Sequence, residues 1–280
     1  MNWRPRSVRG IPDVRFDEPA EGVPAWLRAP IVDWVRGSFY TQGGYIREDA
    51  LTALQLAFRL TNPLATNREL PDLVARVEND QEFALDVLDW MVTESEYFRN
   101  VLYVPEWVDQ LNQLLHQGGS AWEVAAVAGG YQLSRRAVGP VVDVLEQTAT
   151  DATRAHAHLS VAWAKLMGRN PDPSGAYREA VRAVEAVAKP IILPSNDRAT
   201  LGQIIAAARD KPEKWSTTLG GVDDVRTQME AVWTGQLDRH GTDDEEIPLN
   251  VSHEEADAAF SICLNLVRQF VGGHIALSDD

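Results

Sequence analysis

The chain has 280 residues, of which 45% are hydrophobic and 24% charged, and its formal net charge is −15. This length and composition are typical of a globular protein that can bury two cores of ordinary size. The acidity argues against a broad nucleic-acid surface, because nonspecific affinity for nucleic acid depends on many Lys and Arg contacts to phosphate. The sequence shows no apolar run of the length that a signal peptide or a membrane span needs, so we expect a cytoplasmic protein that does not bind membranes.

The first twenty or so residues are rich in Pro, Gly and charge, and we expect them to be irregular. Within this segment, four arginines against Asp13 alone make the first fifteen residues net basic, which is typical of a solvated terminus and could also serve a phosphate or an acidic partner. Helical spacing of apolar residues then predicts helices over residues 24–35, 48–60 and 82–91, and a fourth from Pro105 to Gly118-Gly119. Two short alternating runs follow, Trp122–Val127 and Tyr131–Arg136, around Gly129-Gly130. They predict one small β-hairpin in an otherwise helical region.

Neither Gly nor Pro interrupts the sequence from Val141 to Met167. With Pro140 at its first turn, this pattern predicts one helix of about 40 Å, at 1.5 Å per residue, that bridges the two halves of the chain. We therefore place the domain boundary near residue 150. The sequence predicts an N-terminal, mainly helical domain over residues 1–150 and a helical bundle over residues 151–280.

The second half contains four further helix signals. Asp172-Pro173 opens a helix whose apolar stripe continues to Pro190, and Thr200 precedes a helix over residues 201–209. A helix over residues 222–233 follows, with Asp223-Asp224 at its N-terminal end. Ser252 and Glu255 form the Ser-x-x-Glu pattern of a capping box before the last helix. Its stripe follows helical spacing without a miss and includes Cys263, the only cysteine, which we expect to be a buried hydrophobe in a reducing compartment.

The loop before this last helix contains Arg239-His240-Gly241. A permanent cation lies there beside the side chain that titrates near neutral pH, which suits the handling of a phosphate group. The same loop continues into the acidic run 243–246, which is typical of a solvated loop or of a surface for a protein partner. With His240 this run could also hold a divalent cation, but it lacks a recognised spacing of metal ligands, and we expect neither a metal nor a cofactor.

Several segments of the second half occur in an order that resembles the HEPN-type helical domains (higher eukaryotes and prokaryotes nucleotide-binding) at the C-termini of abortive-infection-like bacterial and phage proteins. The segments are Ala157–Ala164, the run Asn170–Glu185, Ala199–Gly202 and Arg239-His240-Gly241. The resemblance covers residues 150–273. It implies a four- to five-helix bundle, often a homodimer, and many members are metal-independent ribonucleases of toxin, antiviral or abortive-infection systems.

The site of those ribonucleases is an Arg-x4–6-His pair at the start of a late helix. In this chain Arg239 comes immediately before His240, and residues 233–236 contain no arginine, so the resemblance carries over only as an Arg-His-Gly variant. Metal-free RNA cleavage needs a base, an acid and a cation, and His and Arg can fill these roles. The predicted catalytic residues are therefore Arg239 and His240, with Glu185 as an accessory carboxylate at the rim of the core. Alternatively, Glu185 forms a structural ion pair with Arg239.

The sequence has no nucleotide-binding glycine motif, zinc-peptidase motif, serine-hydrolase elbow or CxxC pair. The nine tryptophans lie mostly on or near helical apolar stripes, which favours core packing over base stacking. The sequence thus predicts an all-α, homodimeric, HEPN-like protein with an RNA-directed defence or toxin function, namely a metal-independent endoribonuclease. The alternative is a noncatalytic HEPN-like dimerisation or protein-interaction module, with the acidic loop 243–246 as its binding surface.

Overall fold

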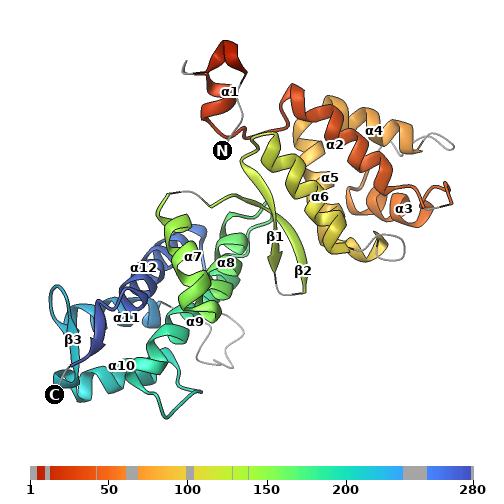
Figure 1. Ribbon diagram of the computed structural model, residues 1–280. Helices are drawn as coiled ribbons and strands as arrows, with labels where there is room; N and C mark the ends of the chain where they lie inside the picture. The colour runs from red at the N-terminus through yellow and green to blue at the C-terminus, as the bar shows by residue number, and fades with distance from the viewer. Residues whose placement is uncertain are drawn as a thin grey trace. The chain divides into compact units, whose positions relative to one another are not determined.

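The protein is mostly helical and contains two small antiparallel sheets of two strands each, as the computed structural model shows (Figure 1). The structure describes residues 5–9, 13–41, 43–60, 69–98, 104–127, 129–137, 139–235 and 251–278. Within these ranges, no helix is both long enough and apolar enough to span a bilayer.

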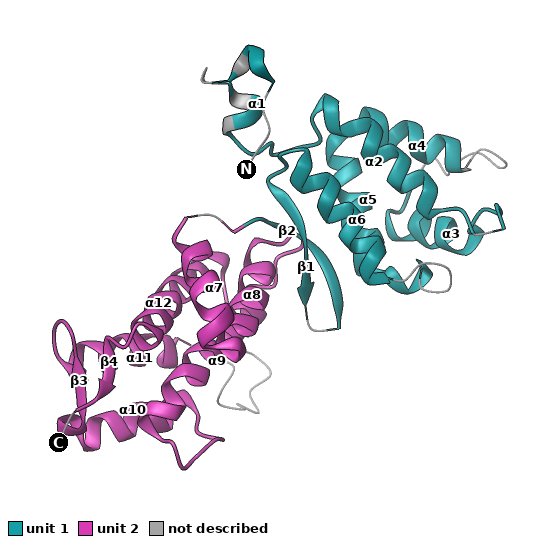
Figure 2. Ribbon diagram, viewed as in Figure 1, with its two compact units in different colours: residues 1–136 teal, residues 137–280 magenta. Residues whose placement is uncertain are grey.

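The chain divides into two compact units, residues 1–136 and 137–280 (Figure 2). The division lies earlier than the boundary near residue 150 that the sequence predicts. The difference is the helix that begins at Pro140, which packs with the second unit. Each unit buries its own apolar cluster.

Unit 1 is built from helices and one hairpin. Its helices are α1 (Val14–Asp17), α2 (Ala25–Ser38), α3 (Glu48–Ala57), α4 (Glu69–Asn79), α5 (Gln81–Thr93) and α6 (Val104–Gln117), with 3-10 turns at Arg6–Val8 and Ser95–Phe98. Four of these match the predicted helices to within a few residues. Helix α4 was not predicted, although Leu70, Leu73, Val74 and Val77 follow helical spacing and are all buried.

Stacked aromatic rings form the centre of the unit 1 core. The ring centroids of Trp34 and Trp107 are 4.7 Å apart, and those of Phe98 and Trp107 are 5.0 Å apart. Trp107 also donates from Nε1 to Ser38 Oγ at 2.7 Å, so its one polar group is satisfied inside the core. The prediction that these tryptophans serve core packing is confirmed for Trp34 and Trp107, which are both buried.

The predicted hairpin is confirmed. Strands β1 (Trp122–Val127) and β2 (Gly130–Arg135) pair antiparallel, with Val127 opposite Gly130. The turn therefore lies one residue earlier than a Gly-Gly turn would, and Gly129 supplies the positive φ of 93° that it needs. The buried carboxylate of Asp89 on α5 accepts a hydrogen bond from Leu133 N at 2.8 Å, which ties β2 to the helices.

The described residues of unit 2 form six helices and one small sheet. The helices are α7 (Pro140–Asp151), α8 (Thr153–Met167), α9 (Pro173–Ile192), α10 (Leu201–Asp210), α11 (Val222–Thr234) and α12 (His253–Val271), and strands β3 (Trp215–Thr217) and β4 (Ile275–Leu277) pair antiparallel, with a 3-10 turn at Pro212–Lys214. Helix α9 continues two residues beyond Pro190, where the sequence predicted its end.

The single helix predicted over residues 140–167 is wrong, because the chain breaks at Ala152. This residue has φ −147° and ψ 60°, outside the helical region. His156 Nδ1 lies 3.0 Å from the carbonyl oxygen of Leu145, whereas eleven residues along one straight helix would separate them by about 16 Å. The break lets α7 pack against α12 as well as α8, so that Val144 is buried in the same core as Leu159. The stabilisation gained by burying α7 against α8 and α12 therefore exceeds the stabilisation lost by interrupting the helix that the sequence pattern favours.

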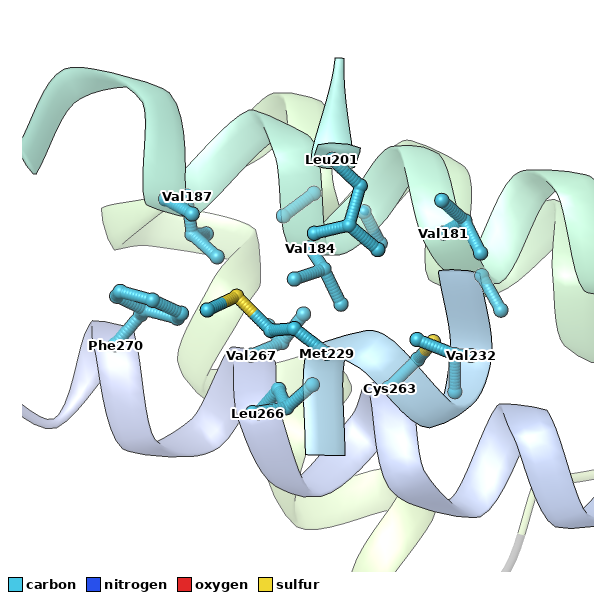
Figure 3. Packing of buried hydrophobic residues seen from close by; sticks show 14 of the residues in the cluster. Val181, Val184, Val187, Leu201, Met229, Val232, Cys263, Leu266, Val267 and Phe270 are labelled. Carbon is cyan, nitrogen blue, oxygen red and sulfur yellow. The ribbon is translucent and has the colours of Figure 1, made fainter. Parts of the chain in front are cut away.

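Helix α9 packs between α8 and α12. Val181, Val184 and Val187 of α9 face Leu266, Val267 and Phe270 of α12 across the core, with Met229 and Val232 of α11 beside them (Figure 3). The capping box of α12 is confirmed, because Ser252 Oγ accepts from Glu255 N at 3.2 Å and Glu255 Oε2 accepts from Ser252 N at 2.8 Å. The predicted stripe of α12 is buried throughout, including Cys263, and burial raises the pKa of its thiol.

The cap of α9 is also confirmed. Asp172 Oδ1 accepts a hydrogen bond from Gly175 N at 2.8 Å, and Asp172 forms an ion pair with Lys165 of α8. Partial burial opposes ionisation of Asp172, but the hydrogen bonds from Lys165 and Gly175 outweigh it and lower the pKa of this carboxyl. The start of α9 is thereby fixed against α8, which matters for the groove described below.

Candidate functional site: a charged groove between helices α8 and α9

Of the predicted site residues, the described part of the chain contains Glu185. Arg239, His240 and the acidic run 243–246 lie outside the described residues. Glu185 is half-buried on α9, at the rim of the core as predicted, and its Oε1 accepts a hydrogen bond from Leu201 N at 2.7 Å. Gln203 Oε1 accepts from Thr200 N at 3.1 Å. The two side chains satisfy backbone N–H groups that the start of α10 leaves without helical partners.

Glu185 lies in the lining of a cavity of about 440 Å³ on unit 2. This volume falls within the range of pockets that hold small molecules. The charged or titratable side chains that line it are Arg154, His158, Arg182, Glu185, Lys189 and Asp197. We call this cavity the α8–α9 groove.

Helical spacing explains why the cationic side chains face one another. Arg154 and His158 are four residues apart and therefore lie on one side of α8, while Arg182 and Lys189 are two turns apart on one side of α9. Small or compact side chains line the cavity between these two rows of cationic side chains. Ala186 lies between Arg182 and Lys189, and Pro190 follows one turn later.

The loop after α9 closes one end of the groove. Leu193, Pro194 and Asn196 line this end. Lys189 Nζ donates to the backbone carbonyl of Asp197 at 3.4 Å, a long contact that draws the lysine side chain toward the loop. The groove is therefore bounded by two helices and a loop of the same unit.

A carboxylate bridges the two helices at the other end. Glu179 Oε2 lies 2.6 Å from His158 Nδ1, and Glu179 Oε1 accepts from Arg182 at 2.7 Å. The side chain of Glu179 is 13% exposed and that of His158 34% exposed. Because an ionised carboxylate can only accept, this contact places a proton on Nδ1 and leaves Nε2 for a ligand. Within the described residues, Nε2 of His158 has no hydrogen-bond partner.

The charges of the groove are mixed. Arg154, Arg182 and Lys189 line it together with two carboxylates, Glu185 and Asp197, and a third carboxylate, Glu179, contacts Arg182 and His158 at its end. One oxygen of Glu185 is already engaged by Leu201 N. Within the ranges that the structure describes, Arg154 forms no ion pair, and Arg182 is half-exposed although it contacts Glu179. Within the same described ranges Lys189 forms no ion pair either, so Arg154 and Lys189 are the cations of the groove that an anion can engage.

His158 is not among the catalytic residues that the sequence predicts. His156 and His158 lie two residues apart on α8 and point to different sides, because His156 contacts Leu145 O while His158 contacts Glu179. The spacing of Glu179 and Arg182 places both on one face of α9. Their meeting with His158 depends on the register between α8 and α9, which one sequence does not reveal.

A second hollow, of about 390 Å³, lies in unit 1 between α6 and β1. Asn112 pairs there with β1, because its side chain accepts from Val124 N at 2.6 Å and donates to Val124 O at 2.9 Å. Burial raises the pKa of Glu123, and the nearby charge of Arg136 opposes this shift. Asp109, His116 and Glu123 also line this hollow, but within the described ranges no three His, Cys, Asp or Glu side chains are placed so that they could hold a metal ion.

Comparison of the chain with known protein families, curated proteins and solved structures finds no match.

Proposed function

We propose that unit 2 is a HEPN-like bundle of four to five helices that acts on RNA in a defence or toxin system, as a metal-independent endoribonuclease. Arg239 and His240 are the proposed catalytic residues, with Glu185 as accessory. The observation that supports this proposal best is the surroundings of Glu185, whose carboxylate lies in a groove with Arg154, Arg182 and Lys189. These cations can attract a polyanion to unit 2 despite the net charge of −15.

The proposed chemistry follows from what metal-free cleavage requires. One group takes the proton of the attacking 2′-hydroxyl, another protonates the departing 5′-oxygen, and a cation stabilises the charge on phosphorus. His240 can serve either proton step, and the Arg239 guanidinium suits the phosphate oxygens. Two chains in a homodimer would supply two histidines, one for each step.

The homodimer belongs to the same proposal. The apolar stripe of α12 is buried within unit 2 itself and offers no face to a second copy. The expectation of a dimer therefore rests on the resemblance. Static light scattering should give about twice the 31.0 kDa of one chain, and a monomer mass at micromolar concentrations would contradict the dimer.

Incubation of the purified protein with total RNA in EDTA tests the activity. We expect cleavage that leaves 2′,3′-cyclic phosphate ends, complete loss in His240→Ala, and severe impairment in Arg239→Lys, because lysine lacks the bidentate grip of guanidinium. His116→Ala is the matched control, since this exposed histidine lies in unit 1.

Two results would overturn the proposal. Cleavage that requires Mg²⁺ would indicate a metal site at the acidic run 243–246 in place of metal-independent chemistry. The second is the absence of RNA cleavage under any condition, combined with retained binding of a protein partner through that run. It would establish the alternative, a noncatalytic interaction module.

A further inference from the structure

We infer that the α8–α9 groove is a binding site for the phosphate group of a small, hydroxyl-bearing molecule. This inference goes beyond the proposed RNA cleavage, because its ligands for phosphate are Arg154, His158, Arg182 and Lys189, none of which is a proposed catalytic residue. It stands or falls independently of Arg239 and His240.

The cationic side chains supply the recognition of phosphate. Arg154 and Arg182 project from opposite walls of the groove, and both present guanidinium groups that match phosphate oxygens. Lys189 adds a point charge at the end that the loop closes. Arg154 comes from α8, and Arg182 and Lys189 come from α9, so cations of both helices line the groove.

His158 is oriented for such a ligand. Glu179 holds Nδ1 at 2.6 Å, so the ring cannot turn freely and Nε2 is directed away from the carboxylate. When the ring is protonated, Nε2–H can donate to a phosphate oxygen. When it is neutral, Nε2 can accept from a hydroxyl group. The groups that face His158 are Arg154 of its own helix and Glu179, Arg182 and Glu185 of α9.

The groove also contains hydrogen-bond acceptors, which inorganic phosphate alone would leave unpaired. Pro190 has no backbone N–H, so the carbonyl of Ala186 lacks the donor that normally follows four residues later in a helix. Ala186 and Pro190 both line the cavity. Asp197 lines it as well, and its backbone carbonyl lies 3.4 Å from Lys189 Nζ. A ligand that carries hydroxyl donors beside its phosphate satisfies these acceptors, and the cavity of about 440 Å³ accommodates one.

Isothermal titration calorimetry of the full chain at constant ionic strength tests this assignment with three probes: ribose 5-phosphate, inorganic phosphate and ribose. We expect saturable binding in the order ribose 5-phosphate, then inorganic phosphate, then ribose. The double variant Arg154→Gln/Lys189→Gln should weaken ribose 5-phosphate by about tenfold or more, the loss expected when a charged hydrogen bond is removed. Ala186→Leu should weaken it to a similar degree by filling the hollow without changing any charge.

The control is Arg209→Gln, which removes one positive charge from an exposed position of α10 outside the groove. It should bind within about twofold of the wild type, because exposed charges are well screened by salt. Circular dichroism of each variant separates loss of the site from loss of the fold.

Three results would overturn the inference. If folded groove variants bind ribose 5-phosphate as tightly as the wild type, the site lies elsewhere. If ribose alone binds as tightly as ribose 5-phosphate, phosphate is not the group recognised. If inorganic phosphate binds as tightly as ribose 5-phosphate, the acceptors of Ala186 and Asp197 contribute nothing. Unchanged RNA cleavage in groove variants that no longer bind phosphate would show that the groove cations do not recruit RNA, and the proposed cleavage would then depend on Arg239 and His240 alone.

Discussion

The cores of the two units are built from different side chains. Unit 1 is centred on large rings, Trp34, Phe39, Phe98 and Trp107, which stack or meet edge to face. Unit 2 is centred on small and branched residues, and α9 alone buries Ala176, Ala180, Ala183, Val184 and Ala188. Small residues let helix axes approach closely, so α8 and α9 bring charged side chains on their outer faces within hydrogen-bonding distance. The difference shows how the choice of core residues can create a site, because the groove of unit 2 lies between two helices that pack against each other through small residues.

Removal of a large ring from unit 1 should give the largest effect on stability. Trp107→Ala deletes the stacking with Trp34 and Phe98 and also the hydrogen bond to Ser38. We expect a loss of about 3–5 kcal/mol, as for other buried aromatic residues replaced by alanine. Chemical denaturation followed by circular dichroism measures this. Leu56→Ala, at an exposed position of the same unit, should change stability by less than about 0.5 kcal/mol. Equal effects of the two changes would show that the aromatic cluster does not hold unit 1 together.

Enlargement of a small residue should have the next largest effect, and in unit 2. Ala180 is fully buried on α9, and Ala180→Leu forces extra atoms into a core without space for them. We expect a loss of about 1–3 kcal/mol from overpacking. Arg178→Leu, on the exposed side of the same helix, is the matched control. A stabilising effect of Ala180→Leu would contradict the view that small residues set the close approach of α8 and α9.

Local sequence patterns predicted the strongly periodic helices and the hairpin well. They predicted poorly the features that depend on contacts between distant segments. The hairpin around Gly129 and the capped helix α12 are confirmed because turn chemistry and capping act over a few residues. Helix α4 was missed, although its apolar spacing is visible in the sequence. The three-residue strands β3 and β4 are too short to show alternation.

Two features of unit 2 could not be predicted from one sequence, for a physical reason. The break at Ala152 occurs in a stretch with good helical spacing, and burial of α7 against α12 decides it. The contact between His158 and Glu179 joins residues on two helices, so it depends on the register of the pair. Glu185 shows the same limit: its rim position follows from helical angles, but its hydrogen bond to Leu201 N depends on where α10 begins.

We propose above all that the α8–α9 groove of unit 2 holds phosphate beside His158. Histidine side-chain NMR spectra recorded during a titration with ribose 5-phosphate test it most directly, with His158 assigned by the loss of its signal in His158→Gln. We predict that the His158 resonances shift saturably while those of His116 in unit 1 and His274 near the chain end stay in place. Two results would contradict the proposed phosphate site. The first is that the His158 resonances do not change at saturating ribose 5-phosphate. The second is that the resonances of all histidines shift equally and that added salt produces the same shifts.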